Sequence, residues 1–209
     1  MSTLSTLAGE GEPKRERPKI RGIKDGEWID VIPYSAHFDP NADKFLPWFW
    51  NRLKTDGLVE LYFPDGKETG FASFVGLMSS NVTKVVLVVV KGTDGLVVDT
   101  VGIATWDPLK MGMISVGIAG FIFLRDYWER HASLAAARRI MQMWFDELKL
   151  NVLLGLIAKD NHLANRFVQR AGWTLQGSLP MLHAYQGEIS DSQMWTITRE
   201  EFEQAKGGE

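Results

Sequence analysis

One stretch of the chain, residues 115–173, decides the fold, and it reads SVGIAGFIFLRDYWERHASLAAARRIMQMWFDELKLNVLLGLIAKDNHLANRFVQRAGW. The pattern predicts a strand, a turn over Arg125–Ser133, a helix, a second strand and a helix led by Asn161. The first N–H groups of a helix are unpaired and its dipole favours an anion, so a strand that leads into a helix suits a phosphate group. Four arginines flank this turn and the helix after it: Arg125, Arg130, Arg138 and Arg139. We therefore predict a site for a phosphorylated cofactor at the turn.

Two apolar segments around the first of these helices predict a parallel strand pair. The segments are Ile114–Leu124 and Val152–Ala158, and the second is apolar throughout, as expected of a strand buried on both faces. A strand–helix–strand unit implies a parallel pair with a right-handed crossover. Between the strands, apolar residues recur at helical spacing and predict core packing: Leu134, Ala137, Met141, Trp144 and Leu148.

The remaining segments predict antiparallel strands and further helices. The sequence GTDG at 92–95 joins two β-rich runs and is a strong hairpin signal. The hairpin strands are Lys84–Val90 and Leu96–Trp106. Further strands are expected at Trp28–Ile32 and Trp173–Gly177, and an antiparallel pair is expected between Leu182–Tyr185 and Ser192–Thr198. Helices are expected over Asp39–Lys54 and Lys67–Ser80. The aromatic cluster Trp48, Phe49 and Trp50 fits either the core or a lid over a ligand.

The decisive stretch resembles the GNAT superfamily of acyl-CoA-dependent N-acyltransferases, and most closely the branch that acetylates ribosomal-protein N-termini, antibiotics and similar amines. The family's pyrophosphate loop falls on Tyr127–Ser133. Of the two positions where the family has small residues, Ser133 is small, whereas His131 is not. Val168 stands where the family commonly has a tyrosine acid. The later family signature and tail fall on Asn161, Gly172, Trp173, Gly187, Asp191, Met194–Ile197 and Arg199–Glu203.

The resemblance implies an α/β fold with a mixed central β-sheet flanked by helices, and acetyl-CoA as co-substrate. The pantetheine arm of the cofactor is expected to pair with the strand end at Phe123 and Leu124. The pyrophosphate is expected to meet backbone N–H groups of the loop and helix start, and Asn161 to contact the cofactor while capping its helix. The loop and helix-start residues are Arg130, His131, Ala132, Ser133 and Leu134.

Composition narrows the classes of protein further. The chain has 209 residues and a net charge of −3, and the absence of a basic excess argues against nucleic-acid partners. It has no cysteine, which argues against thiolate metal sites and disulfide scaffolds. Residues 1–27 are expected to be a flexible leader and 28–209 a single acyltransferase domain. The apolar runs are too short to span a membrane and no secretory signal is evident, so a cytoplasmic location is expected.

The chemistry requires a neutral amine, a base for its proton and an acid for the leaving thiolate. The candidates for these roles are Tyr185, His183, Asp107 and Asp191, and of these we expect Tyr185 to be the acid and His183 the base. The four histidines lack metal-ligand spacing, so no metal is expected. The leading interpretation is an N-acetyltransferase that acts by direct attack on a primary amine, which could be a protein N-terminus, a lysine or a small amine. The alternative is an inactive GNAT-fold binding or structural protein, and either form could be oligomeric or part of a larger assembly.

Removal of Met1–Gly22 tests the assignment of the leader. The composition of this segment cannot offset its ordering entropy by burial, so we expect the truncated protein to melt at nearly the same temperature as the full chain. A large fall in melting temperature would mean that the leader packs on the domain or on a second subunit.

Overall fold

The computed structural model describes residues 27–62, 70–128, 132–186 and 188–207. The expected leader therefore lies almost wholly outside the described residues, as do Arg130 and His131 of the loop and Gly187 of the tail. In the described part of the chain, no helix is long and apolar enough to cross a membrane.

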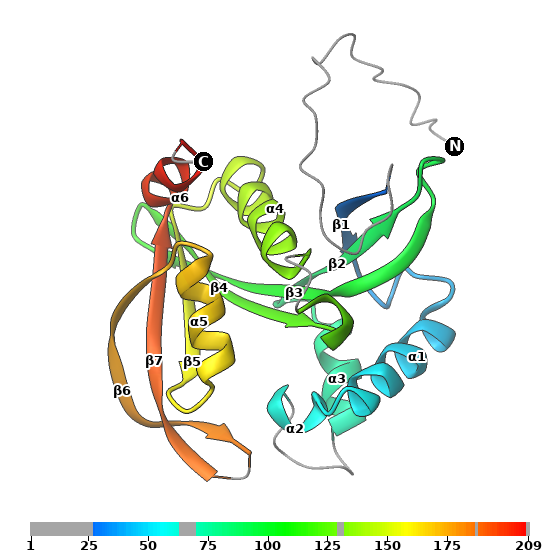
Figure 1. Ribbon diagram of the computed structural model, residues 1–209, viewed down its shortest axis with the longest axis horizontal. Coiled ribbons are helices and arrows are strands. Elements are labelled where there is room, and N and C mark those ends of the chain that lie inside the picture. Colours follow the sequence, from blue (N-terminus) through cyan, green and yellow to red (C-terminus); the bar gives the residue numbers. More distant parts are fainter. Residues whose placement is uncertain (1–26, 63–69, 129–131, 187, 208–209) are drawn as a thin grey trace, which may run out of the picture.

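The elements follow one another as strands and helices of an α/β fold (Figure 1). In chain order they are β1 (Trp28–Tyr34), α1 (Ala42–Thr55), α2 (Val59–Tyr62), α3 (Gly70–Met78), β2 (Lys84–Lys91), β3 (Val97–Met111), β4 (Ile114–Phe123), the 3-10 turn η1 (Arg125–Tyr127), α4 (Ala132–Asp146), β5 (Val152–Ala158), α5 (His162–Arg170), β6 (Thr174–Tyr185), β7 (Glu188–Thr198) and α6 (Arg199–Gly207).

The strands form one seven-stranded mixed sheet in the order β1-β2-β3-β4-β5-β7-β6. The β4–β5 pair is parallel and the other neighbouring pairs are antiparallel. The expected mixed central sheet, the 92–95 hairpin and the parallel pair around α4 are thus confirmed.

Helices cover both faces of the sheet (Figure 1). Phe121 of β4 contacts Trp144 of α4 and Phe167 of α5, at ring-centroid distances of 5.4 and 6.3 Å, so these two helices share a face. On the other side, Phe49 of α1 stacks on Phe74 of α3 at 6.0 Å, and both rings are fully buried. Of the aromatic cluster, Phe49 and Trp50 belong to the core, whereas Trp48 is 43% exposed.

Some expectations about individual elements are wrong. Leu148 is 40% exposed, because α4 ends at Asp146 and the chain turns through Lys149 at φ 56°. β5 is buried only at alternating or end positions, because part of it borders a cleft. The segments expected as separate strands around Gly177 and Leu182 form the single strand β6, with an irregular register between Leu179 and His183.

The last helix begins with a reciprocal pair of hydrogen bonds. The backbone N–H of Thr198 donates to Glu201 Oε2 at 2.7 Å, and the N–H of Glu201 donates to Thr198 Oγ1 at 3.2 Å. This capping box satisfies two N–H groups at the helix start. The bond from the Thr198 N–H is also the main reason why the pKa of Glu201 is lowered from its ordinary value of 4.5.

We expect Glu201→Ala to lower the free energy of unfolding by about 1 kcal/mol, because it removes the capping carboxylate. The folded-state pKa is lowered, so this contribution is present above about pH 4.5 and is lost as the pH falls further. Denaturant unfolding at pH 7 and at pH 3.5 measures both effects. Glu200→Ala, one residue away and exposed, is the control; an equal loss in the two variants would contradict the capping role.

Candidate functional site

Two neighbouring strands part in the middle of the sheet. β4 and β5 pair only through Val116–Ile118 and Val152–Leu154, yet β4 continues to Phe123 and β5 to Ala158. Beyond Ile118 the facing backbone edges do not pair with each other, and buried backbone groups require a partner. The divergence leaves an open strand edge inside the molecule.

A cleft of about 740 Å³ occupies this gap, within the range of small-molecule sites. Its walls come from β4 and β5, from α4 and α5 on one face of the sheet, and from α2 and α3 on the other. A molecule held between the strands could therefore be approached from either face.

The α4–α5 side of the cleft contains the residues expected to hold the cofactor. Phe123, Ser133, Leu134 and Asn161 all line it. Ser133 and Leu134 lie in the first turn of α4, where backbone N–H groups have no acceptor within the helix. Asn161 Oδ1 accepts from the N–H of Ala164 at 3.1 Å, so the expected helix cap is confirmed.

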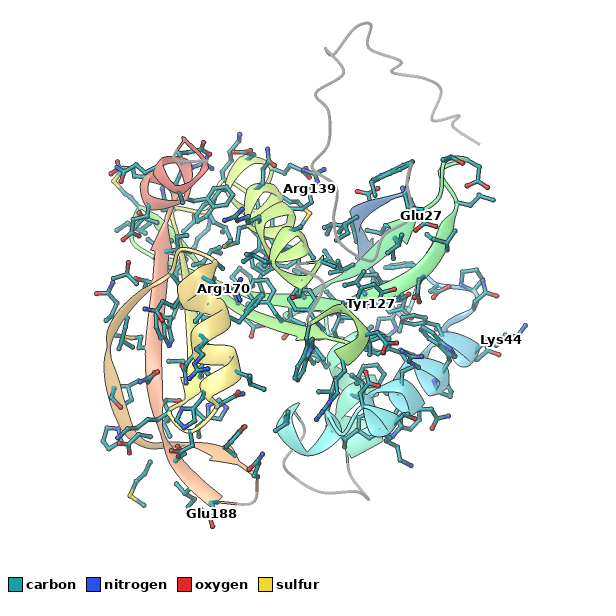
Figure 2. The ribbon with its side chains drawn as sticks, viewed as in Figure 1. Glu27, Lys44, Tyr127, Arg139, Arg170 and Glu188 are labelled. Carbon is teal, nitrogen blue, oxygen red and sulfur yellow. The ribbon has the colours of Figure 1, made fainter. Side chains whose placement is uncertain are left out.

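Other expected cofactor residues lie elsewhere. Leu124 is 1% exposed and its N–H donates to the Val101 carbonyl at 2.9 Å. Ala132 is fully buried at the start of α4. Neither residue is part of the cleft wall. Arg139 extends from α4 in the direction of β1 (Figure 2), where Asp30 forms an ion pair with Lys91 at 2.7 Å.

The opposite side of the cleft contains both expected catalytic residues. His183 and Tyr185 of β6 line the wall together with Leu61, Leu77 and Thr105. His183 Nδ1 lies 3.1 Å from the hydroxyl of Ser192, which is fully buried on β7. Burial lowers the pKa of His183 below its ordinary value of 6.5, so the neutral imidazole is favoured.

The cleft wall also includes residues that we did not expect. Arg166 and Arg170 line it from α5 and are spaced one helical turn apart; this spacing was a usable signal in the sequence. Thr105, Leu61 and Leu77 come from elements distant in the sequence, and no local pattern indicates them. Val168, at the position of the family tyrosine, is also part of the wall.

One side chain fixes the edge of the cleft at the end of β5. Asn165 Nδ2 lies within 3.0–3.2 Å of the carbonyl oxygens of Ala158, Lys159 and Asn161, and its Oδ1 accepts from Trp195 Nε1 at 2.9 Å. The amide thus ties β5, the start of α5 and β7 together. Its role was not expected, because an Asn inside a helix is seldom informative by itself.

Within the described residues, no group of three or more His, Cys, Asp or Glu side chains is placed so that it could hold a metal ion.

The geometry agrees with what comparison with known proteins shows. The acetyltransferase (GNAT) domain profile matches residues 27–174. A spermidine N-acetyltransferase from Vibrio cholerae, solved with CoA and spermine, has a TM-score of 0.62 at 11% identity, over 86% of this chain and 99% of that one. A GNAT-family acetyltransferase from Bacillus anthracis has a TM-score of 0.59 at 17% identity, over 87% and 99%.

No curated protein matches the chain, and at these identities the solved structures show likeness of fold. The domain match, however, covers more than half of the sequence. The chain therefore belongs to the acetyltransferase (GNAT) family and is an acetyl-CoA-dependent N-acetyltransferase.

Proposed function

We propose that the acetyl group passes directly from acetyl-CoA to a primary amine within the cleft between β4 and β5. The observation that carries this proposal is that the cleft has walls on both faces of the sheet. Cofactor and acceptor could then meet in the gap from opposite sides, and proximity would supply much of the acceleration. The chain has no cysteine, so no thiol is available to carry the acetyl group in between.

On the α4–α5 side, the open edge of β4 near Phe123 would pair with the pantetheine arm. The N–H groups of Ser133 and Leu134, with Arg130 and His131 that precede the helix, would bind the pyrophosphate, and Asn161 would contact the arm. Ala132 drops out of this set, because it is fully buried at the start of α4. Arg166 and Arg170 would attract the remaining phosphate. Leu124 drops out of our assignment, because its N–H is already bonded.

On the other side, His183 and Tyr185 would handle the protons. The amine nitrogen attacks the thioester carbonyl carbon and loses a proton to His183 Nε2. The C–S bond then breaks and the thiolate takes the proton of the Tyr185 hydroxyl. His183 releases the amine proton to solvent, and solvent restores the proton of Tyr185. The lowered pKa of His183 supports its role as the base, because it is unprotonated at neutral pH.

We propose a small primary amine as the acceptor. The Vibrio cholerae neighbour was solved with such an amine, spermine. The resemblance of Tyr127–Ser133 to the N-terminal acetyltransferase branch favours a protein N-terminus as the second candidate. Either acceptor fits the cytoplasmic location that the sequence predicts.

Calorimetry with acetyl-CoA, followed by CoA release with a panel of small amines and N-terminal peptides, tests the proposal. We expect binding of acetyl-CoA and turnover with small amines. Turnover with peptides alone would favour the second candidate, and binding without turnover of any amine would contradict the transfer reaction.

Tyr185→Phe tests the acid. We expect kcat to fall about tenfold. The loss should be smaller than in a reaction with a poor leaving group, because a thiolate departs fairly readily without a proton. The dissociation constant of acetyl-CoA should stay the same, which separates chemistry from binding. An unchanged kcat would remove Tyr185 from the mechanism.

Ser192→Ala tests how His183 is oriented. We infer that the Ser192 hydroxyl accepts the Nδ1 proton, which leaves Nε2 as the base. Its loss should lower kcat/KM about two- to tenfold, as expected for one hydrogen bond, and should shift the acidic limb of the pH profile of kcat/KM. Ser178→Ala, an exposed serine on β6, is the matched control; an identical pH profile in both variants would exclude the positioning role.

A further inference from the structure

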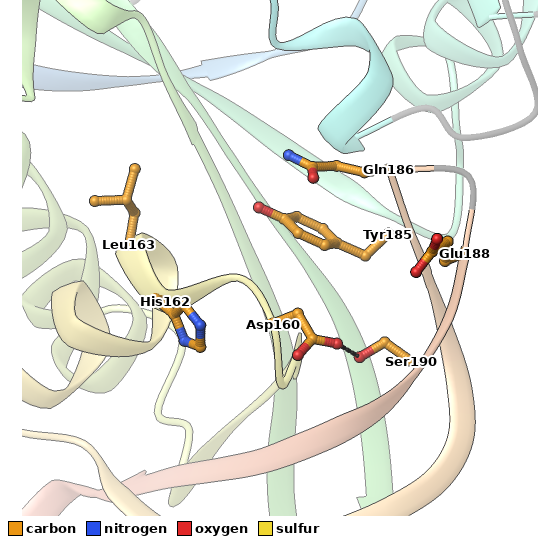
Figure 3. A pocket seen from close by; sticks show the side chains of 7 residues that line it. All are labelled: Asp160, His162, Leu163, Tyr185, Gln186, Glu188 and Ser190. Carbon is orange, nitrogen blue, oxygen red and sulfur yellow. Dashed lines mark hydrogen bonds between the residues drawn. The ribbon is translucent and has the colours of Figure 1, made fainter.

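A second cavity opens beside the cleft. It has a volume of about 470 Å³ and lies between the start of α5 and the end of the β6–β7 hairpin (Figure 3). Leu163 and Tyr185 line both the cavity and the cleft. In Figure 3 the Tyr185 ring extends across the cavity, with its hydroxyl on the side of Leu163 and Glu188 on the opposite side. An elongated molecule could therefore occupy both spaces at once.

The cavity is negatively charged. Asp160 and Glu188 contribute carboxylates, and no Lys or Arg belongs to its described lining. Asp160 Oδ2 accepts a 2.6 Å hydrogen bond from the hydroxyl of Ser190, which is itself buried and fixes the carboxylate in place. Among the described residues, neither carboxylate has a cationic partner within ion-pair distance. A concave surface of one charge sign concentrates its potential and raises the local concentration of oppositely charged ligands.

The shape and the ligand set favour an organic cation over a metal ion. Asp160, His162 and Glu188 all line the cavity, yet they do not converge into a cluster that could hold a metal. The lining also includes the Leu163 side chain and the Tyr185 ring, which suit an alkyl chain and an ammonium group near an aromatic ring. A short chain that ends in an ammonium group matches both parts.

We propose that this cavity binds a second positive charge of the acceptor, so that the preferred acceptors are aliphatic amines with two ammonium groups. The inference rests on the proposed transfer reaction and names the substrate class for the same site. One nitrogen lies in the cleft beside Tyr185 and His183, and the other lies near Asp160 and Glu188. Tyr185 stands between the two spaces, so the distant charge fixes which nitrogen reaches the thioester.

The test compares 1,4-diaminobutane with n-butylamine, two acceptors with the same carbon chain that differ by one ammonium group. We expect the wild-type protein to have the higher kcat/KM with the diamine. Glu188→Gln should lower the ratio of diamine to monoamine kcat/KM about threefold, chiefly through KM, since one solvent-exposed charge is lost. Raising the salt concentration to about 0.5 M should also lower the ratio of diamine to monoamine kcat/KM of the wild-type protein, because salt screens the charges.

Glu200→Gln on α6 removes an equal charge far from the cavity and should leave the ratio unchanged. Asp160→Asn with Glu188→Gln should abolish the preference; because Asp160 is bonded to Ser190, thermal unfolding is measured alongside to establish that the double variant is folded. A ratio that is unaffected in both Glu188→Gln and the folded double variant would overturn the inference while the transfer reaction stands.

Binding separates this inference from the reaction itself. Calorimetry of 1,4-diaminobutane with the CoA-bound protein needs no turnover. If no amine is acetylated, the proposed reaction fails, whereas diamine binding that Glu188→Gln weakens would still establish the cavity as a cation site. No diamine binding to the wild-type complex would overturn the inference.

Discussion

Three residue pairs hold β4 to β5, and the geometry of the site depends on how early this pairing ends. Parallel strands are usually buried on both faces and paired along their length. Here α4 and α5 pack against the parting strands on one face, and Asn165 holds the free end of β5 to its neighbours. The open edge of β4 thus lies between packed helices and an anchored neighbouring strand, which suits a site that must hold a reactive thioester in one position.

The two sides of the gap differ in charge and in origin. The α4–α5 side has a helix start and the exposed cations Arg166 and Arg170, which suit phosphate groups. The side of His183 and Tyr185 adjoins the cavity between the start of α5 and the β6–β7 hairpin, where Asp160 and Glu188 contribute carboxylates. Phosphate groups near Arg166 and Arg170 and an ammonium group near Glu188 would each meet complementary charge, which would help to orient the ternary complex.

Sequence patterns predicted the site where its residues are close together along the chain. The β4–α4–β5 unit and the Asn161 cap are local, and both are confirmed. Periodicity could not find the end of α4, because the turn at Lys149 has a positive φ without the glycine that normally signals it. Thr105 and Ser192 become part of the site only through strand pairing, which brings Thr105 opposite Gly120 and Ser192 opposite Ala158.

The position of Val168 explains why the proposed acid lies on a different element. Val168 is 5% exposed and packs in the wall on the α5 side, where an aliphatic side chain can exclude water but cannot donate a proton. A proton donor for the sulfur would then come from across the gap, and the described residue with a hydroxyl on the hairpin side of the cleft wall is Tyr185. The same ring borders the acidic cavity. Proton delivery and recognition of the acceptor would therefore depend on one side chain, which couples the rate of the chemical step to the shape of the bound amine.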